Sequence, residues 1–383
     1  MSYEFDTRCI HGNQQTEREH SYGAVTMPIY QTATFAHPGV GKSTSYDYTR
    51  AGNPTRNELE QVVTSLEGGI DTVACASGMA AIGLMMELFE TGSNLVCTED
   101  LYGGSVRMFD NVYGHKEITF TYVDTSDAVA TEAAITPQTK AIFVETPSNP
   151  TMLVTDLRKM REIADRHGLW VIIDNTFLSP YFQRPFEYGA DIVLHSGTKF
   201  LGGHNDTLAG FLCVRDTKIA ERVRFLYKTI GSGLSPFDSF LIARGIKTLP
   251  VRMERQQENA IAIANWLKEC PYVEKVFYVG LSEHPGYEVN RSQASGSGSM
   301  ISFVVDSAET ARWVLENIRL ITYAESLGGV ESLMTYPILQ THADVPIDTR
   351  ERLGINDKLL RLSVGIENVA DLIADLEQAF SRR

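Results

Sequence analysis

The sequence predicts an α/β fold: a mostly parallel sheet with helices on both faces, followed by a smaller C-terminal α/β domain. From about Glu58 onward, helical patterns alternate with short runs rich in Val and Ile. Several runs are apolar on both faces, as strands buried within a parallel sheet are. The length of 383 residues also exceeds what one hydrophobic core normally serves. We therefore expect two domains preceded by an arm.

The arm covers residues 1–55, which fit the alternating pattern poorly. PIYQTATF at 28–35 could form a strand, but much of the remainder is Gly, Thr and Tyr with little helical periodicity. Such a segment cannot build a core of its own. We expect it to gain order by packing on another subunit.

Residues 56–248 form the predicted main domain. Its expected strands are TVACAS, NLVCTED, FTYVDT, AIFVET, WVIIDNT and DIVLHS. Because right-handed crossovers bring the carboxyl ends of parallel strands to one edge, ligands of such sheets bind there. Polar residues close four of these runs and are expected at an active site: Ser77, Glu145, Asp174 and Ser196.

Residues 249–383 form the predicted smaller domain. A long helix from Met253 to Cys270 is followed by strand patterns in VEKVFYVG, SMISFVVD and LLRLSVGIE and a helical pattern in ETARWVLENIRL. A final helix is expected from Val369.

Composition and charge exclude several classes of protein. With 43% hydrophobic and 21% charged residues the chain is an ordinary globular protein. A net charge of −14 would repel a phosphate backbone, so we expect no nucleic-acid partner. The most apolar helical stretch, 80–89, is short and carries Glu87, and the first residues lack a signal-peptide pattern. We expect a cytoplasmic protein with no membrane segment.

The cysteine and histidine patterns predict neither disulfides nor a metal site. The five cysteines are scattered, odd in number and show no CxxC spacing. His195, His204 and His342 lack metal-ligand spacing, and His195 is expected to pack beside the loop that follows its strand.

The sharpest chemical signal is a lysine and an aspartate at the ends of two neighbouring apolar strands. Lys199 follows DIVLHS among small and hydroxyl residues, where nearby cations can favour the neutral amine that imine formation requires. Asp174 closes WVIID and could pair with a protonated ring nitrogen, which keeps a pyridinium an electron sink. Taken alone, the pair is equally compatible with a surface lysine and a turn-capping aspartate.

Three further segments favour a flat, phosphorylated cofactor. ACASGMAAIGLMM runs from a strand through Ser77 and Gly78 into a helix, whose first free N–H groups form an anion site. YDYTRAGNPTR supplies Tyr48 and Arg50, which are suited to phosphate. EDLYGGSVR places Tyr102 beside two glycines, which leaves its ring free to stack.

These residues together resemble the trans-sulfuration (Cys/Met metabolism) family of PLP-dependent enzymes, closest to cystathionine γ-synthase and cystathionine γ-lyase. The motifs YDYTRAGNPTR, SGM, LYGG, ETPSNP, DNTF, HSGTKFLGGH, AESLGGVESL and RLSVGIE occur in the family's order and approximate spacing across nearly the whole chain. The resemblance implies the PLP-dependent transferase fold of type I. It also implies pyridoxal 5'-phosphate (PLP) as the cofactor, bound by the 56–248 domain.

The resemblance implies roles for the cofactor-binding residues. Lys199 carries PLP as a Schiff base, Asp174 binds the ring nitrogen and Tyr102 stacks on the ring; these three are the catalytic candidates. Asn149 approaches the ring hydroxyl. The phosphate is held by Ser77, Gly78, Met79, Ser196 and Thr198, and by Tyr48 and Arg50 of a neighbouring subunit.

Substrate binding and assembly follow from the same resemblance. Arg361 and Ser326 receive the substrate α-carboxylate, while Glu325 and Asp47 contact its distal part. A site shared between chains makes a homodimer the minimum unit, and the family suggests a tetramer of two such dimers.

The motifs shared by the family do not name the reaction. GSGLSPFDSF and ESLMTYPILQTHADVP look most like bacterial γ-synthases, which favours γ-replacement on an O-acyl-L-homoserine. Cystathionine γ- or β-lyase and O-acetylhomoserine sulfhydrylase are alternatives. Gly104 stands where methionine γ-lyases carry a cysteine, which counts against that activity. A non-catalytic member or a nucleotide-binding protein is disfavoured because Lys199 and Asp174 are retained and no GxGxxG is present.

Overall fold

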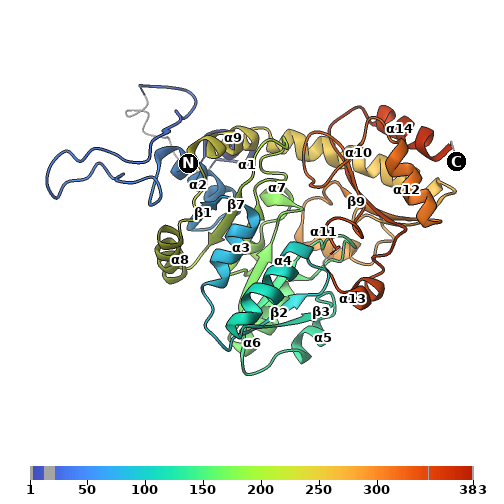
Figure 1. Ribbon diagram of the computed structural model, residues 1–383, viewed down its shortest axis with the longest axis horizontal. Coiled ribbons are helices and arrows are strands. Elements are labelled where there is room, and N and C mark those ends of the chain that lie inside the picture. Colours follow the sequence, from blue (N-terminus) through green and yellow to red (C-terminus); the bar gives the residue numbers. More distant parts are fainter. Residues whose placement is uncertain (1–2, 13–21, 344, 382–383) are drawn as a thin grey trace.

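A seven-stranded sheet lies at the centre of the larger part of the protein (Figure 1). The computed structural model describes residues 3–12, 22–343 and 345–381. The strand order is β1-β7-β6-β5-β4-β2-β3; the five strands from β6 to β3 are parallel, and β7 is antiparallel to both β6 and β1. The strands are β1 (Asp71–Cys75), β2 (Asn94–Thr98), β3 (Thr119–Val123), β4 (Thr139–Glu145), β5 (Trp170–Asp174), β6 (Ile192–Ser196) and β7 (Gly210–Val214).

Helices cover both faces of this sheet because its strands are apolar on both sides. Ile173 packs in one buried cluster with Leu59 and Ile163, whereas its neighbour Ile172 packs in another with Met85 and Val223. The helices are α1 (Phe5–His11), α2 (Pro54–Glu67), α3 (Gly78–Met86), α4 (Gly103–Met108), α5 (Ala128–Ala133), α6 (Leu157–His167), α7 (Ser179–Phe182), α8 (Thr217–Ile230), α9 (Pro236–Ile246) and α10 (Leu249–Glu269). A π-helical turn (Phe109–Tyr113) and two 3-10 turns (Gly114–Lys116 and Pro185–Tyr188) complete this part.

A second sheet of five strands, in the order β10-β11-β12-β9-β8, follows the long helix α10. Only the β10–β11 pair is parallel. Its elements are β8 (Val273–Phe277), α11 (Tyr287–Gln293), β9 (Met300–Val305), α12 (Ala308–Asn317), β10 (Thr322–Tyr323), β11 (Leu333–Thr335), α13 (Ile347–Arg352), β12 (Leu359–Ser363) and α14 (Val369–Ser381). This sheet and α10, α12 and α14 share a third buried cluster. The predicted fold class, a mostly parallel sheet followed by a smaller α/β unit, is therefore confirmed.

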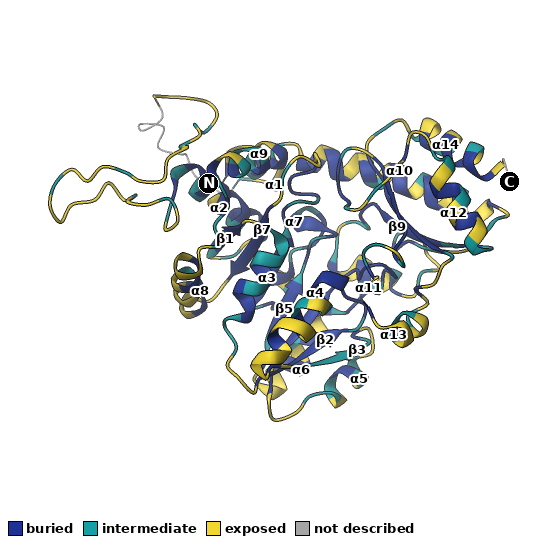
Figure 2. Ribbon diagram, viewed as in Figure 1, coloured by how far each residue is buried: buried dark blue, intermediate teal, exposed yellow. Residues whose placement is uncertain are grey.

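The segment between α1 and α2 differs from the sequence expectation. Residues 22–53 form neither helix nor strand, and most of them are exposed in a loop that extends away from the rest of the chain (Figures 1 and 2). The strand predicted at 28–35 is wrong. Residues 28–35 have side chains that favour strands, but among the described residues they pair with no strand. Their one β-type pairing within the described ranges is an isolated bridge between Thr34 and Tyr48. The short helix α1 within the expected arm was not predicted either.

Two further findings concern single features. Within the described parts of the chain, no helix combines the length and the apolar character that crossing a bilayer requires. All five cysteines are buried free thiols.

Candidate active site

Three parallel strands end side by side with polar residues. Glu145 at the end of β4 pairs in register with Asp174 at the end of β5, and Asp174 pairs with Leu194, two residues before Ser196 at the end of β6. Lys199 lies in the turn that follows β6, where its N–H donates to Ser196 O at 3.2 Å. The sequence prediction that these residues share one sheet edge is confirmed.

Lys199 is a largely desolvated amine. Its Nζ donates to Ser326 Oγ at 2.7 Å. Desolvation and the positive charge of Arg361 lower the pKa of Lys199 to about 8, while the negative charge of Glu325 opposes this shift. A larger fraction of this amine than of an exposed lysine is therefore unprotonated near neutral pH, and the unprotonated form is the one that attacks an aldehyde.

The buried guanidinium of Arg361, on β12, joins the two sheets at this point. One nitrogen, Nη1, donates to Asn149 Oδ1 at 2.8 Å, and Nη2 donates to Ser326 O and Thr335 Oγ1, each at 3.1 Å. Its Nε is buried without a hydrogen-bond partner among the described residues. Burial lowers the pKa of Arg361 to about 10, and the Glu145 carboxylate opposes the shift. Arg361 thus remains a cation at the floor of the site.

Asp174 presents a fixed carboxylate at the end of β5. Its Oδ1 accepts from the Thr176 N–H at 3.0 Å and from Thr176 Oγ1 at 2.6 Å. Desolvation raises the pKa of Asp174, while the two bonds from Thr176 and the charge of His195 oppose that shift. The side chain is therefore oriented by its own turn.

His195 is the penultimate residue of β6. The imidazole is buried, and its Nε2 is hydrogen-bonded to Glu67 Oε1. The same carboxylate oxygen accepts from Asn175 Nδ2 at 3.1 Å. No sequence pattern pointed to Glu67, which lies at the end of α2, far from His195 along the chain.

Tyr102 stands at the start of α4 with an exposed side chain. Its N–H donates to Glu145 Oε2 at 3.0 Å. Burial and the neighbouring Asp174 raise the pKa of Glu145 well above its usual range. A Cβ on Gly104 would lie 2.4 Å from Tyr102 Cε1, and one on Gly103 would lie 2.2 Å from Thr341 O. The two glycines of the LYGG motif thus leave room for the Tyr102 ring. Glu145 fixes the Tyr102 backbone, and this role of Glu145 was not predicted from the sequence.

The turn between β1 and α3 forms an anion cradle. Ser77 caps α3, and its Oγ accepts from the Ala80 N–H at 3.1 Å. A Cβ on Gly78 would lie 2.9 Å from Ser196 Cβ, so only glycine allows this approach of the two strand ends. The N–H groups of Gly78 and Met79 are at the helix N-terminus, where no intrahelical acceptor exists.

Thr198 lies opposite this cradle on the lysine turn. Its Oγ1 accepts from the Ala209 N–H at 3.0 Å, and its own N–H donates to Ala209 O at 3.3 Å. The turn is therefore tied to the residue before β7. Glu325, adjacent to Ser326, is exposed, and its charge acts on both Lys199 and Arg361.

The structure does not bring three predicted site residues to Lys199 within one chain. Arg50 donates from Nη1 to Lys228 O and lies 5.5 Å from the Tyr48 ring centroid. Asp47 accepts from Ser43 Oγ at 2.6 Å. The side chains of Asp47, Tyr48 and Arg50 are all exposed.

Comparison with known proteins gives one consistent family. The sequence model of the Cys/Met metabolism PLP-dependent enzymes matches residues 6–381. The cystathionine beta-lyase of Lactococcus lactis subsp. cremoris (strain MG1363) is 44% identical over 377 residues, 98% of this chain and 99% of the relative. The cystathionine gamma-synthase of Haemophilus influenzae (strain ATCC 51907 / DSM 11121 / KW20 / Rd) is 45% identical over 383 residues, 100% of this chain and 99% of the relative.

A solved structure agrees. The crystal structure of cystathionine gamma-lyase from Lactobacillus plantarum, complexed with L-serine, superimposes with a TM-score of 0.96 at 43% identity, covering 99% of both chains. The family resemblance and the type I fold expected from the sequence are confirmed. This chain therefore belongs to the Cys/Met metabolism PLP-dependent enzyme family and is a trans-sulfuration enzyme whose cofactor is PLP.

Proposed function

We propose that this enzyme catalyses γ-replacement on an O-acyl-L-homoserine with cysteine, forming a C–S bond. Glu325 is the observation that carries the proposal. Arg361 provides a buried cation for an α-carboxylate, and Glu325 provides an exposed carboxylate beside it. An exposed carboxylate suits the ammonium of cysteine, the second amino acid, whereas sulfide offers no such group. The full-length similarity to a gamma-synthase supports the same reading.

The residues of the site fit PLP in three respects. The Lys199 amine has a lowered pKa, the Asp174 carboxylate is fixed by Thr176, and Gly78 keeps open a cradle that a Cβ would fill. Lys199 would hold the cofactor covalently and Asp174 would pair with its ring nitrogen. Tyr102 would lie against the ring and Asn149 near the ring hydroxyl. The phosphate would be held by Ser77, Gly78, Met79, Ser196 and Thr198.

The chemistry divides between cofactor and chain. PLP, when bound, withdraws electrons from the carbon chain of the amino-acid substrate. Arg361 and Ser326 bind the α-carboxylate, and the Nζ of Lys199 takes the proton from Cα. The acyloxy group leaves Cγ with the C–O electron pair as a carboxylate. The cysteine sulfur supplies the pair for the new C–S bond and gives up its thiol proton to solvent, and Lys199 returns its proton to Cα. Glu325 holds the cysteine ammonium, with Asp47 of the arm contributing at the distal end.

A second candidate is cleavage of cystathionine at a C–S bond. Its support is the similarity to a beta-lyase and to a solved gamma-lyase, both at more than 40% identity over nearly the whole chain. The same Arg361 and Glu325 would then bind the two amino-acid ends of one substrate.

Parallel assays of the purified enzyme decide between these reactions. We expect kcat/KM for cysteine addition to O-acetyl- or O-succinylhomoserine to exceed kcat/KM for cystathionine cleavage, with methionine inert. Glu325→Gln should raise KM for cysteine about tenfold, since a charge-assisted bond is lost, and leave turnover with sulfide unchanged. Glu316→Gln is the control, because Glu316 is an exposed glutamate on α12. Faster cystathionine cleavage would refute γ-replacement as the main reaction.

We also propose that two subunits share each active site and that two such dimers form a tetramer. Tyr48 and Arg50 are both exposed, and the one bond of the Arg50 guanidinium to its own chain goes to the Lys228 carbonyl, which a phosphate of the neighbour's cradle would replace. Mixing Arg50→Ala with Lys199→Ala protein after dissociation should restore part of the activity, because one site of each mixed dimer then has both native residues. No recovery despite verified exchange would place Arg50 in its own chain's site.

A further inference from the structure

The exposed Tyr48 and Arg50 flank a residue that is firmly anchored. Thr49 donates its N–H to Ala33 O at 2.9 Å, and its carbonyl accepts from Arg56 Nη2 at 2.5 Å. Its hydroxyl is also bonded, accepting from Asn53 Nδ2 at 3.2 Å. Every polar group of Thr49 therefore has a partner, whereas the side chains of Tyr48 and Arg50 on either side of it are exposed.

Arg56 is the one cation in this anchor, and its guanidinium is almost wholly buried. Besides Thr49, it donates from Nη1 to Leu234 O at 3.0 Å. The guanidinium carbon lies 5.5 Å from the Tyr227 ring centroid, and Nε lies 3.8 Å from Glu60 Oε1. The Arg56 guanidinium thus joins Thr49 of the arm to Leu234, in the loop between α8 and α9.

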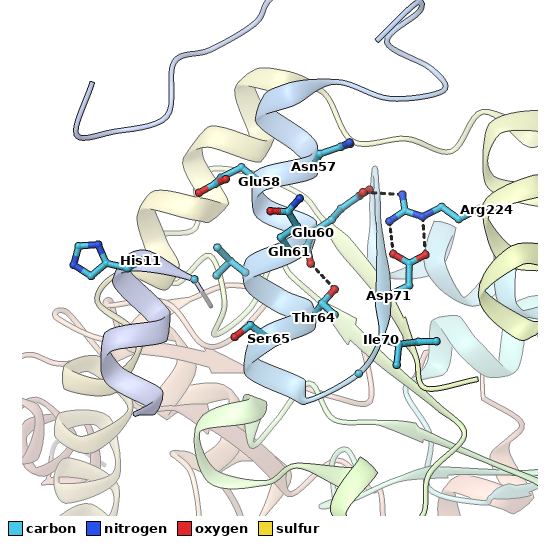
Figure 3. Close-up of a pocket in the computed structure, with 13 residues that line it drawn as sticks. His11, Asn57, Glu58, Glu60, Gln61, Thr64, Ser65, Ile70, Asp71 and Arg224 are labelled. Carbon is cyan, nitrogen blue, oxygen red and sulfur yellow. Dashed lines mark hydrogen bonds and ion pairs between the residues drawn. The ribbon is translucent and has the colours of Figure 1, made fainter. Parts of the chain in front are cut away.

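Glu60, the acidic residue beside Arg56, belongs to a hydrogen-bonded cluster with Arg224 and Asp71 (Figure 3). Glu60 Oε2 accepts from Arg224 Nη1 at 2.7 Å, and Arg224 donates to the two oxygens of Asp71 at 2.8 and 2.5 Å. Glu60 Oε1 accepts from the Ala74 N–H at 3.0 Å. Glu60 is therefore fixed by α8 and β1, and it holds Arg56 in place one helical turn earlier on α2.

The loop that Arg56 contacts is attached to the chain's own phosphate cradle. Leu234 N–H donates to Ala74 O, and Ala76 N–H donates to Ser232 O, each at 2.9 Å. Ala76 immediately precedes Ser77. Arg56 consequently lies between its own cradle and the arm that, in the proposed shared site, serves the partner.

We infer that Arg56 is a positioning residue, which fixes the arm so that Tyr48 and Arg50 are preorganised for the cofactor phosphate in the partner subunit's site. The inference rests on the proposed shared site. Preorganisation increases affinity because the segment loses less conformational freedom on binding. An arginine fork reaches two carbonyls on opposite sides, whereas a lysine ammonium at the same position holds one.

The first test compares two ligands of the full-length protein. Arg56→Lys should weaken binding of PLP about tenfold and leave binding of pyridoxal, which lacks the phosphate, unchanged. Thr49→Val, which removes the hydroxyl anchor without touching the core, should show the same selective loss. Arg255→Lys is the control, since Arg255 is exposed on α10 and pairs with Glu258 at 3.2 Å. Equal losses for the two ligands, or none in either variant, would overturn the inference.

Mixed dimers then show in which subunit Arg56 acts. In an Arg56→Lys chain paired with a Lys199→Ala chain, the site with the native lysine receives its arm from the chain with native Arg56. We expect PLP bound covalently at that site to have wild-type affinity. Weak binding there would mean that Arg56 acts on its own cradle, which contradicts the inference. If Arg50→Ala and Lys199→Ala chains also fail to complement each other, the shared site itself fails instead.

Discussion

The Nζ of Lys199 donates a 2.7 Å hydrogen bond to Ser326 Oγ. This bond connects the turn after β6 of the large sheet with the loop between β10 and β11 of the small sheet. Ser326 has a φ of 87°, in the left-handed region that few side chains adopt. Two residues later, a Cβ on Gly328 would lie 2.7 Å from Phe200 N, so the Ser326 loop packs directly on the lysine turn. The position of the amine therefore depends on how the two sheets pack.

The first prediction concerns the ionisation of Lys199. Because its pKa is about 8, cofactor-free protein should react with pyridoxal at a rate that rises with pH through about 8 and then levels off. Ser326→Ala should move this midpoint to lower pH, since the hydroxyl that accepts from the ammonium is lost. Stopped-flow absorbance gives the profile. A rate still rising at pH 10 would show an unperturbed lysine.

The second prediction concerns Asp174. Asp174→Asn keeps the side-chain shape but cannot stabilise a protonated ring nitrogen, so turnover should fall by at least about tenfold while the thermal midpoint changes little. Asp165→Asn, an exposed carboxylate paired with Arg161 at 2.8 Å, is the matched control. Steady-state kinetics and thermal unfolding are measured on both. Near-normal turnover of Asp174→Asn would show that the ring nitrogen is held by another group.

The third prediction concerns Arg361. In Arg361→Lys a single ammonium replaces the guanidinium that donates to Asn149 Oδ1, Ser326 O and Thr335 Oγ1. At least one of these buried oxygens then has no donor. We expect KM for the amino-acid substrate to rise and the free energy of unfolding to fall by about 1–3 kcal/mol. Kinetics and urea denaturation measure the two effects. A lower stability with unchanged KM would mean that Arg361 supports the fold but does not bind the substrate carboxylate.

The fourth prediction concerns the phosphate cradle. Gly78→Ala places a Cβ 2.9 Å from Ser196 Cβ, so the two strand ends must move apart. PLP affinity should fall, whereas pyridoxal affinity should change less, because the displaced N–H groups face the phosphate. Gly114→Ala, where the nearest atom is Phe109 O at 3.7 Å, is the control. Unchanged PLP affinity in Gly78→Ala would exclude this turn as the phosphate site.

The sequence was informative where one local pattern determines the structure. The apolar runs before Asp174 and Ser196 predicted β5 and β6, because residues buried on both faces of a sheet must be apolar. The polar residues after them then had to share one edge. Strand β7 was not predicted, because GFLCV follows a polar loop and joins the sheet antiparallel without a crossover helix.

Contacts between distant residues were not predictable from such patterns. Nothing in the sequence indicates that Glu145 accepts from the Tyr102 N–H, or that Glu67 bonds to His195. The convergence of Asn149 and Arg361 was expected only through the family resemblance, since their separation along the chain carries no periodicity. The first two contacts depend on how helices and strand ends pack around the large sheet, and the third depends on how the two sheets pack; no local pattern encodes either.

Strand β1 lies at one edge of the large sheet, and side chains and a loop cover that edge. Ala74 N–H donates to Glu60, Ala74 O accepts from Leu234 N–H, and Thr72 O accepts from Arg224 Nη2 at 2.7 Å. An open strand edge is a template for pairing with another polypeptide and for aggregation. With these groups occupied, this edge of the sheet offers no free ladder at Thr72 and Ala74. Separation of α2 or α8 from the sheet during folding would expose the backbone of β1. These two helices therefore protect the folding chain from aggregation as well as stabilise the site.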